Sequence, residues 1–271
     1  MKKEKMQGYK IFKTILGIIY KLYYNPKIIG KENILKEGPI ILAGNHIHIM
    51  DQCNVIISTH RAIHYMAKKE YFDNKKTKWF FQAAGCIPVD RSIKDEDAKE
   101  SALEVLRDGF ALGIFPEGTR NALKKERVEE IYNKYQINEP FKTYYKKVKK
   151  SKTSEVNYLE ELFQEKKITK EEFLNHIKDA DKYLNKLIKE KKITKEKYEE
   201  HILLPLKFGT VSMAQKTNAY IIPYGISGTY RFRSKNLKIR IGKPFKVGED
   251  LEKANQKLKA EIIKLMKENE K

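Results

Sequence analysis

The amino-acid sequence predicts an α/β fold in which a mixed β-sheet is flanked by helices. Short apolar runs rich in β-branched residues alternate with amphipathic helical patterns, and glycine or proline separates many of them. This alternation stops at the stretch 124–202, which is dense in Lys, Glu, Tyr and Leu and contains no glycine. We therefore expect three parts: an N-terminal amphipathic membrane-associating helix within 1–28, an α/β domain formed by 29–123 and 203–271, and an inserted all-α helical-hairpin arm at 124–202.

The composition is that of a globular and strongly basic protein. With 271 residues, of which 41% are hydrophobic, the chain can bury a core and still carry an insertion. The net charge of +20 indicates a polyanionic partner. An anionic membrane surface is favoured over nucleic acid, because no base-reading motif accompanies the lysines. Cys53 and Cys86 stand alone, so we expect reduced thiols, a cytosolic setting and no metal site.

The first element is a helix predicted over 9–24. Isoleucines and leucines recur there at helical spacing, and lysines fall on the opposite side. Charges at Lys13 and Lys21 interrupt the roughly 20 apolar residues that a membrane span needs. No small-residue cleavage site follows, so a signal peptide is not expected either. Such a helix either lies in the headgroup layer of a membrane or packs on the domain core.

The apolar run 39–43 is predicted to be a buried strand, and the polar segment after it contains a possible general base. On a regular helix His46 and Asp51 would point about 140° away from each other. They can meet only if His46 lies on the turn after the strand and Asp51 in the first turn of the next helix. An imidazole held by a carboxylate at a strand end is the arrangement that a general base requires. His48, three residues before Asp51, is a rival for the same carboxylate.

A second polar site is predicted after the next strands. We predict a helix near 54–58, a strand at 63–67 and a helix at 76–83. A short apolar segment follows them and is directly succeeded by Asp90 and Arg91. The guanidinium of Arg91 can bind a phosphate by its planar fork, or it can pair with Asp90.

A third polar site follows a helix predicted at 95–108 and a buried strand at 110–115. The glycine of Pro116-Glu117-Gly118-Thr119-Arg120 permits a tight turn, which presents Glu117 and Arg120 close together at a strand edge. These two side chains either bind a ligand or form an ion pair that stabilises the loop.

The last part of the α/β domain follows Pro205. There we expect a helix to Lys216, strands at 219–223 and 237–241, and a closing helix at 250–269.

The arm contains two copies of a 25-residue repeat, seen in 159–173 and 184–198. Each copy is predicted to be a small helical hairpin whose second helix starts at a threonine N-cap, Thr169 or Thr194. Glu172 completes a capping box in the first copy, whereas Lys197 stands at that position in the second. The copies resemble the "Ile-Thr-x-Glu-Glu-Phe" hairpins appended to many bacterial proteins. Their histidines, His176 and His201, are expected to be solvated or hairpin-packing residues rather than ligands.

Four segments, in chain order, resemble the motif blocks of the glycerophospholipid acyltransferases. They are Asn45-His46-x-x-x-x-Asp51, Gly85-Cys-Ile-Pro-Val-Asp-Arg91, Phe115-Pro-Glu-Gly-Thr-Arg120 and Tyr220-Ile-Ile-Pro223. The pieces 67–70 and 205–209 are also similar to segments of that family, and the resemblance covers about 30–122 and 203–245. The chain departs from the family pattern at His48, where Ser, Thr or Gln is usual, and in the arm, which replaces a short loop.

The resemblance implies an acyltransferase that moves an acyl group from a thioester to the sn-2 hydroxyl of 1-acylglycerol 3-phosphate, giving phosphatidic acid. His46 would be the general base oriented by Asp51. The acceptor's glycerol phosphate would be held by residues from three segments: Lys68, Arg91, Glu117, Gly118, Thr119 and Arg120. The co-substrate would be acyl-CoA or acyl-acyl carrier protein, and no other cofactor, metal or covalent acyl-enzyme is implied.

The expected setting is the cytoplasmic face of the cell membrane, to which the protein would bind peripherally or monotopically. Two alternatives stay open. Glycerol 3-phosphate itself or another lysolipid could be the acceptor. In the other alternative, the chain is a non-catalytic basic adaptor on the membrane surface, in which the arm recruits an unknown protein partner.

Overall fold

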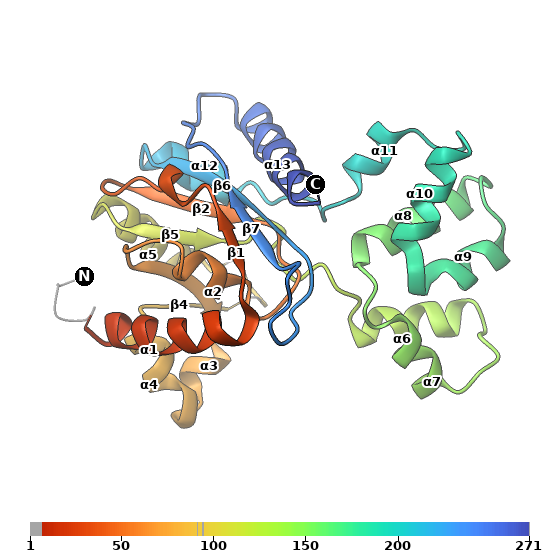
Figure 1. Ribbon diagram of the computed structural model, residues 1–271, viewed down its shortest axis with the longest axis horizontal. Coiled ribbons are helices and arrows are strands. Elements are labelled where there is room, and N and C mark those ends of the chain that lie inside the picture. The colour runs from red at the N-terminus through yellow and green to blue at the C-terminus, as the bar shows by residue number, and fades with distance from the viewer. Residues whose placement is uncertain (1–6, 91, 94, 271) are drawn as a thin grey trace. The chain divides into compact units, whose positions relative to one another are not determined.

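The computed structural model describes residues 7–90, 92–93 and 95–270, and the chain divides into two compact units. The sheet unit comprises the residues up to 118 and those from 206 onward (Figure 1). The helical unit comprises 119–205. It begins and ends a few residues outside the arm that the composition predicts at 124–202.

Among the described residues, seven strands form one mixed sheet in the order β1-β7-β6-β2-β5-β3-β4. The strands are β1 (Lys27–Ile29), β2 (Ile40–Gly44), β3 (Ile63–Lys68), β4 (Ile87–Val89), β5 (Ala111–Ile114), β6 (Tyr220–Ser227) and β7 (Lys238–Ile241). β6, β2, β5, β3 and β4 run parallel, whereas β7 is antiparallel to β6 and pairs in parallel with β1. The predicted α/β fold is confirmed. The carboxyl ends of five strands meet at one edge, where open α/β sheets bind ligands.

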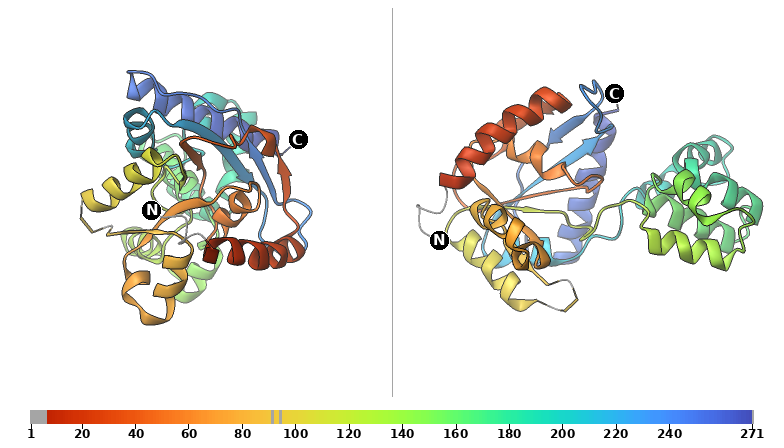
Figure 2. Two further views of the ribbon diagram at one scale, coloured as in Figure 1. Left: turned by 90° about the vertical axis from the view of Figure 1, so that its left-hand side faces the viewer. Right: turned by 90° about the horizontal axis from the view of Figure 1, so that it is seen from below.

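Helices cover both faces of the sheet (Figure 2). One face carries α5 (Glu96–Arg107), α12 (Gly209–Lys216) and α13 (Leu251–Glu268), and α12 contacts both of the others. The other face carries α1 (Gln7–Tyr24), which contacts α2 (Asp51–Ile56) and α4 (Lys75–Ala83). The short helices α3 (Glu70–Asp73) and η2 (Lys31–Asn33) complete the sheet unit.

The sequence of the central strand β2 is an unbroken apolar run because the strand is buried on both faces. All of its residues are buried, because helices cover both faces of the sheet at this point. The strands and helices predicted from periodicity lie within a few residues of the observed ones. One boundary was wrong in a way that matters: the helix predicted near 54–58 begins at Asp51 instead, so that Asp51 occupies its first turn.

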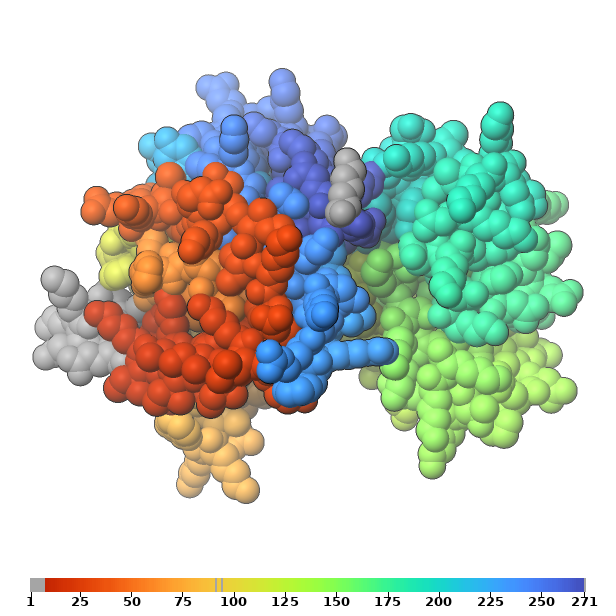
Figure 3. Space-filling view, in the orientation of Figure 1, coloured from red at the N-terminus to blue at the C-terminus, as the bar shows by residue number. Residues whose placement is uncertain are grey.

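Helix α1 packs on the sheet unit with its more polar side. That side carries Tyr9, Lys13, Gly17 and Tyr20, and the two tyrosines are only 5% and 4% exposed. The outward side carries exposed aliphatic residues: Ile11, Ile15, Leu16, Ile18, Ile19 and Leu22. In the part of the chain that the structure describes, every helix is too short or too polar to cross a bilayer. The helix thus contacts the core and also has an uncovered apolar face. The N-terminal part of the chain, coloured red, lies at the surface of the sheet unit in Figure 3.

The helical unit has a hydrophobic core of its own. It is built from α6 (Lys125–Lys134), α7 (Phe141–Val148), α8 (Thr153–Gln164), α9 (Lys170–His176), η3 (Ile177–Asp179), α10 (Ala180–Lys189) and α11 (Lys195–Glu200). Thr169 caps α9 with the complete capping box that the sequence predicts, and Thr194 caps α11 without one. His176 and His201 stack on tyrosine rings at centroid distances of 3.9 and 4.0 Å, which identifies them as packing residues.

Gly44 at the end of β2 lies so close to Tyr224 that the structure has no room for a side chain at this position. A Cβ at residue 44 would lie 2.2 Å from the ring of Tyr224 on the adjacent strand β6. We therefore expect Gly44→Ala to lower the free energy of unfolding by about 1–3 kcal/mol or more. The matched control is Gly209→Ala at the start of α12, where a Cβ meets no atom within 4 Å. Thermal denaturation should show a lower Tm for the first variant only, and equal Tm values would contradict the packing described here.

Candidate active site

The polar residues singled out in the sequence follow the ends of parallel strands. His46 follows β2, Glu117 follows β5, and Lys68 is the last residue of β3. The register aligns Ala43 of β2 with Ile114 of β5, so the segments after these two strands start side by side. The fold therefore places His46 and the turn that contains Glu117 at the carboxyl edge of the sheet.

His46 and Asp51 contact each other in the geometry that their spacing predicted. Nδ1 of His46 lies 2.8 Å from Oδ2 of Asp51, with His46 on the turn after β2 and Asp51 in the first turn of α2. The carboxylate is an acceptor, so Nδ1 carries the hydrogen and Nε2 is left as the basic nitrogen. The His46 side chain is 17% exposed and that of Asp51 is fully buried. The imidazole can thus be reached from outside while the group that orients it is shielded.

The turn between the two residues also binds the carboxylate. Oδ2 of Asp51 accepts hydrogen bonds from the backbone N–H groups of Ile47 (2.6 Å) and His48 (2.7 Å). Oδ1 accepts a hydrogen bond from the hydroxyl of Tyr230. A buried carboxylate needs such donors, because an uncompensated charge is costly away from water.

The ring of His46 is held from a second direction. It stacks on Phe115 with ring centroids 3.9 Å apart and planes 12° apart. The backbone N–H of His46 donates to Oε1 of Glu117 at 2.9 Å. Glu117 is only 4% exposed, so part of its role is to join the turns that follow β2 and β5. These contacts fix the imidazole relative to both strands.

His48 does not take the place of His46. Its Nδ1 accepts a hydrogen bond from the backbone N–H of Met50 at 3.3 Å, and its ring stacks on Tyr230 at 4.1 Å. The backbone N–H of His48 donates to Oδ2 of Asp51, whereas His46 approaches the same oxygen with its ring nitrogen Nδ1. His46 is therefore the imidazole that Asp51 orients.

Gly118 adopts a left-handed conformation, with φ of 70°, as the predicted tight turn requires. Lys207 lies over this glycine: a Cβ at residue 118 would come within 2.7 Å of Cε and 2.9 Å of Nζ of that lysine. The backbone N–H of Lys207 also donates to the carbonyl of Pro116 at 2.9 Å. Lys207 is thus a cation beside the Glu117 turn.

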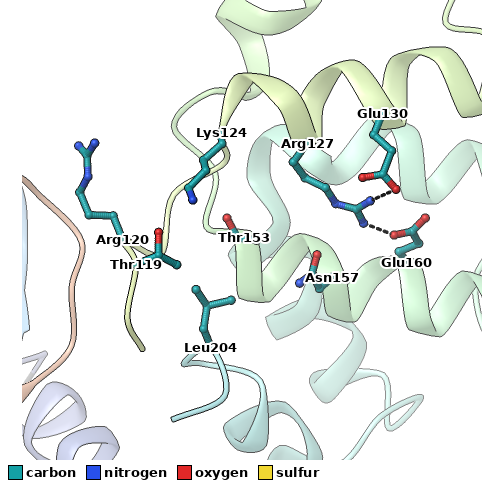
Figure 4. Close-up of a pocket in the computed structure, with 9 residues that line it drawn as sticks. All are labelled: Thr119, Arg120, Lys124, Arg127, Glu130, Thr153, Asn157, Glu160 and Leu204. Atoms are coloured by element: carbon teal, nitrogen blue, oxygen red, sulfur yellow. Dashed lines mark hydrogen bonds and ion pairs between the residues drawn. The ribbon is translucent and has the colours of Figure 1, made fainter. Parts of the chain in front are cut away.

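Four further residues were predicted for the site: Lys68, Arg91, Thr119 and Arg120. Arg91 lies outside the described residues. Lys68 is exposed at the end of β3, level with Val89 of β4. Thr119 and Arg120 belong to the helical unit, where they line a cavity of about 470 Å³, and the Arg120 side chain points away from Arg127 (Figure 4). Of the predicted residues, the structure brings together His46, Asp51 and Glu117, and Gly118 follows Glu117 in the chain.

Several residues of the site were missed by sequence reasoning. They are Asn45, Asn54, Phe115, Lys207 and Tyr230. The Asn45 side chain accepts from the N–H of Ile226 and donates to its carbonyl, at 2.7 and 2.9 Å, which ties the end of β2 to β6. Asn45 and Phe115 are the first residues of two motif blocks, and Lys207 lies in the similar piece 205–209, so the resemblance could have drawn attention to them. Asn54 and Tyr230 carry no local signal, because the residues they bind are remote in sequence.

Comparisons with known proteins agree with this geometry. A family model described as "Acyltransferase" matches residues 25–227. The 1-acyl-sn-glycerol-3-phosphate acyltransferase of Bacillus subtilis is 32% identical over 115 residues, which is 42% of this chain and 58% of that protein. The protein of the same name from Borreliella burgdorferi is 38% identical over 96 residues, 35% of this chain and 38% of that protein. The matched segments therefore span about half of these relatives or less.

A solved structure shares the fold. The crystal structure of the 1-acyl-sn-glycerophosphate acyltransferase PlsC from Thermotoga maritima matches with a TM-score of 0.58. The match covers 99% of this chain and 83% of the other, at 15% sequence identity.

Both cysteines should be poorly reactive in the native protein. Burial raises the pKa of the Cys53 thiol to about 11, and the charge of Asp51 adds to this shift. Burial likewise raises the pKa of Cys86 to about 11. Because the thiolate is the nucleophile, iodoacetamide at pH 8 should modify both residues on the order of a hundredfold more slowly than a free thiol. Mass spectrometry should show full modification once urea is added, and rapid labelling of either native cysteine would refute the described burial.

Proposed function

The chain belongs to the acyltransferase family, and from this premise we propose that it acylates the sn-2 hydroxyl of 1-acylglycerol 3-phosphate to give phosphatidic acid. The names of the two relatives support this acceptor. The observation that carries the proposal is the imidazole–carboxylate pair at the carboxyl edge of the sheet, with a distance of 2.8 Å between Nδ1 of His46 and Oδ2 of Asp51.

In the proposed reaction His46 acts as the general base. Its Nε2 takes the proton from the sn-2 hydroxyl as the oxygen attacks the thioester carbonyl, and Asp51 stabilises the imidazolium that forms. The tetrahedral intermediate then expels the thiolate, which receives the proton from His46. The ester bond forms, the thioester bond breaks, and the protein ends in the state in which it began. No covalent acyl-enzyme is required.

The acceptor is held by charge in this proposal. Lys207 and Lys68 are cations at the carboxyl edge within the sheet unit, and a phosphate is attracted to such groups. Arg91 and Arg120, together with Gly118 and Thr119, are assigned to the same task by the motif resemblance. Glu117 would steer an arginine or accept a hydrogen bond from the acceptor while it keeps its bond to His46 N–H. The acyl donor is acyl-CoA or acyl-acyl carrier protein, and neither a metal nor another cofactor enters the proposed steps.

Both proposed lipids carry acyl chains, and the structure offers a surface suited to them. The outward aliphatic side chains of α1 are uncovered, with Ile15 and Ile18 each 55% exposed and Leu22 69% exposed. An apolar helix face of this kind inserts into the boundary between headgroups and acyl chains. We therefore propose that α1 holds the enzyme on the cytoplasmic face of the membrane and that anionic lipids attract its basic surface.

The first test is an acyl-transfer assay. Purified protein with 1-acylglycerol 3-phosphate and an acyl thioester should produce phosphatidic acid and should be nearly inactive on bare glycerol 3-phosphate. His46→Ala and Asp51→Asn should each lower the rate at least about a hundredfold, because each removes part of the general base. His60→Ala, which changes an exposed histidine of the sheet unit, is the matched control and should keep the wild-type rate. The assigned roles fail if His46→Ala and Asp51→Asn keep wild-type rates, and the acceptor assignment fails if glycerol 3-phosphate is used equally well.

The second test concerns the membrane. Replacing Ile15, Ile18 and Leu22 together with serine should reduce binding to anionic vesicles at least about a hundredfold, since burying each such side chain contributes up to about 1.5–3 kcal/mol. The control variant, Glu252→Ser with Gln256→Ser, changes exposed residues of α13. Vesicle flotation should recover the control with the lipid, and the bound fraction should fall as salt is raised. Undiminished flotation of the triple variant would exclude α1 as the lipid-binding element.

A further inference from the structure

We propose that Tyr230, Asn54 and Tyr20 are positioning residues that hold Asp51 in place, so that helix α1 determines the geometry of the His46–Asp51 pair. This proposal rests on the proposed function above, because it assigns to these residues the task of supporting its general base. None of the three belongs to the motifs from which the site was recognised, and they come from widely separated parts of the chain.

A continuous series of hydrogen bonds connects α1 to the carboxylate. The hydroxyl of Tyr20 donates to Oδ1 of Asn54 at 3.0 Å. Nδ2 of Asn54 donates to the hydroxyl oxygen of Tyr230 at 2.7 Å. The hydroxyl of Tyr230 donates in turn to Oδ1 of Asp51, whose Oδ2 is bonded to Nδ1 of His46. Asp51 therefore has one oxygen for the catalytic imidazole and the other for this relay.

Every donor in the relay points toward the carboxylate. Tyr230 can give its only hydrogen to Asp51 because Asn54 supplies a hydrogen to the Tyr230 oxygen. Asn54 is oriented in the same way, since its amide oxygen faces the Tyr20 hydroxyl. Series of this kind polarise one another and strengthen the last bond, which here is the bond to the anion. Loss of the Tyr20 hydroxyl should therefore weaken the hydrogen bond from Tyr230 to Asp51.

Most of the relay is shielded from water, and the Tyr230 side chain at its centre is half-buried. Asn54 and Asp51 are 0% exposed and Tyr20 is 4% exposed. Burial, followed by the charge of Asp51, raises the pKa of Tyr230 far above its ordinary value. Burial also raises the pKa of Tyr20. Both phenols thus keep their hydrogens at any pH where an acyl thioester survives, and both remain donors.

Aromatic packing fixes the Tyr230 ring from two elements. His48 stacks on one side of it, with ring centroids 4.1 Å apart, and belongs to the same turn that binds Asp51. Tyr24, in the last turn of α1, meets the ring edge-on at 5.6 Å. Tyr20 in turn packs against Tyr24 at 5.0 Å. A displacement of α1 would move these neighbours and the hydroxyl of Tyr20 together.

The chain offers a matched pair of substitutions on one helix. Tyr20 and Tyr9 are both buried residues of α1, and each hydroxyl makes a buried hydrogen bond, but Tyr9 accepts from the backbone N–H of Ile63 and does not touch the relay. Tyr20→Phe should lower kcat with little change in KM. Tyr9→Phe should lower Tm by a similar amount or more and leave kcat unchanged.

Tyr230→Phe should have the larger effect, a fall in kcat of about tenfold to a hundredfold, the scale of one hydrogen bond to a charged group. Its acid limb in the profile of kcat/KM against pH should also move to higher pH. A carboxylate that loses the donor on Oδ1 has more negative charge to stabilise a protonated imidazole on Oδ2. Tyr20→Phe should move this limb in the same direction by less. Cys53, Tyr65 and Tyr224 also lie in the electrostatic surroundings of Asp51, and Glu117 lies in those of Tyr224; all four are unchanged in these variants.

The double variant Tyr20→Phe/Tyr230→Phe distinguishes a relay from separate structural effects. If Tyr20 acts through Tyr230, its substitution should cost little once Tyr230 is phenylalanine, so the two effects should not add. Wild-type kcat and pH midpoint in Tyr230→Phe, or purely additive losses, would overturn the proposal. If Tyr230→Phe does not fold, the comparison of kcat between Tyr20→Phe and Tyr9→Phe tests the proposal by itself, and equal kcat values would overturn it. His46→Ala in the same assays separates the two hypotheses: an inactive His46→Ala beside an unaffected Tyr230→Phe ends the relay only, whereas an active His46→Ala ends the proposed function.

Discussion

The buried carboxylate of Asp51 is the constraint on which the site depends. A negative charge at 0% exposure requires hydrogen-bond donors at both oxygens, and in this protein they come from several segments. The turn after β2 supplies two backbone N–H groups and an imidazole, and the segment after β6 supplies the Tyr230 hydroxyl. Burial of the Asp51 carboxylate costs free energy unless its oxygens are hydrogen-bonded. For the same reason each donor is held at a fixed position relative to this carboxylate. The hydrogen bonds to Asp51 thereby fix the positions of the turn after β2, the start of α2 and the segment after β6 relative to one another.

Much of the fold could be predicted from local patterns. The unbroken apolar run of β2 and the amphipathic spacing of α5 and α13 follow directly from burial on two faces or on one. The contact between His46 and Asp51 was predictable because a strand end followed by a helix start is the one local geometry that joins residues five apart. Helices α6 and α7 were not identified from the sequence, although each buries apolar side chains on one side: Val128 and Ile131 in α6, Tyr144 and Val148 in α7.

The parts of the site that could not be predicted are those formed by tertiary contact. Tyr230 and Asp51 are far apart in the chain, and no spacing rule connects an isolated tyrosine to a remote carboxylate. Lys207 reaches Gly118 because the chain returns to the sheet unit there, and the insertion in between hides that proximity. Motif reasoning thus singled out His46 and Asp51, whose contact the structure shows, whereas the residues that hold Asp51 follow only from the coordinates.

Hydrogen bonds join the two ends of the helical unit, and they affect the order in which the protein can fold. Asn121, Ser154 and Ile202 are joined by hydrogen bonds of 2.8 to 3.2 Å, so the first and last turns of the insertion are tied together. Strand β6 must pair with β2 across this whole stretch of chain. An insertion that has already collapsed acts as a short linker, and the entropy lost on bringing the two strands together is that of a much smaller loop. Early assembly of the helical unit would then accelerate completion of the sheet, which needs strands from both ends of the polypeptide.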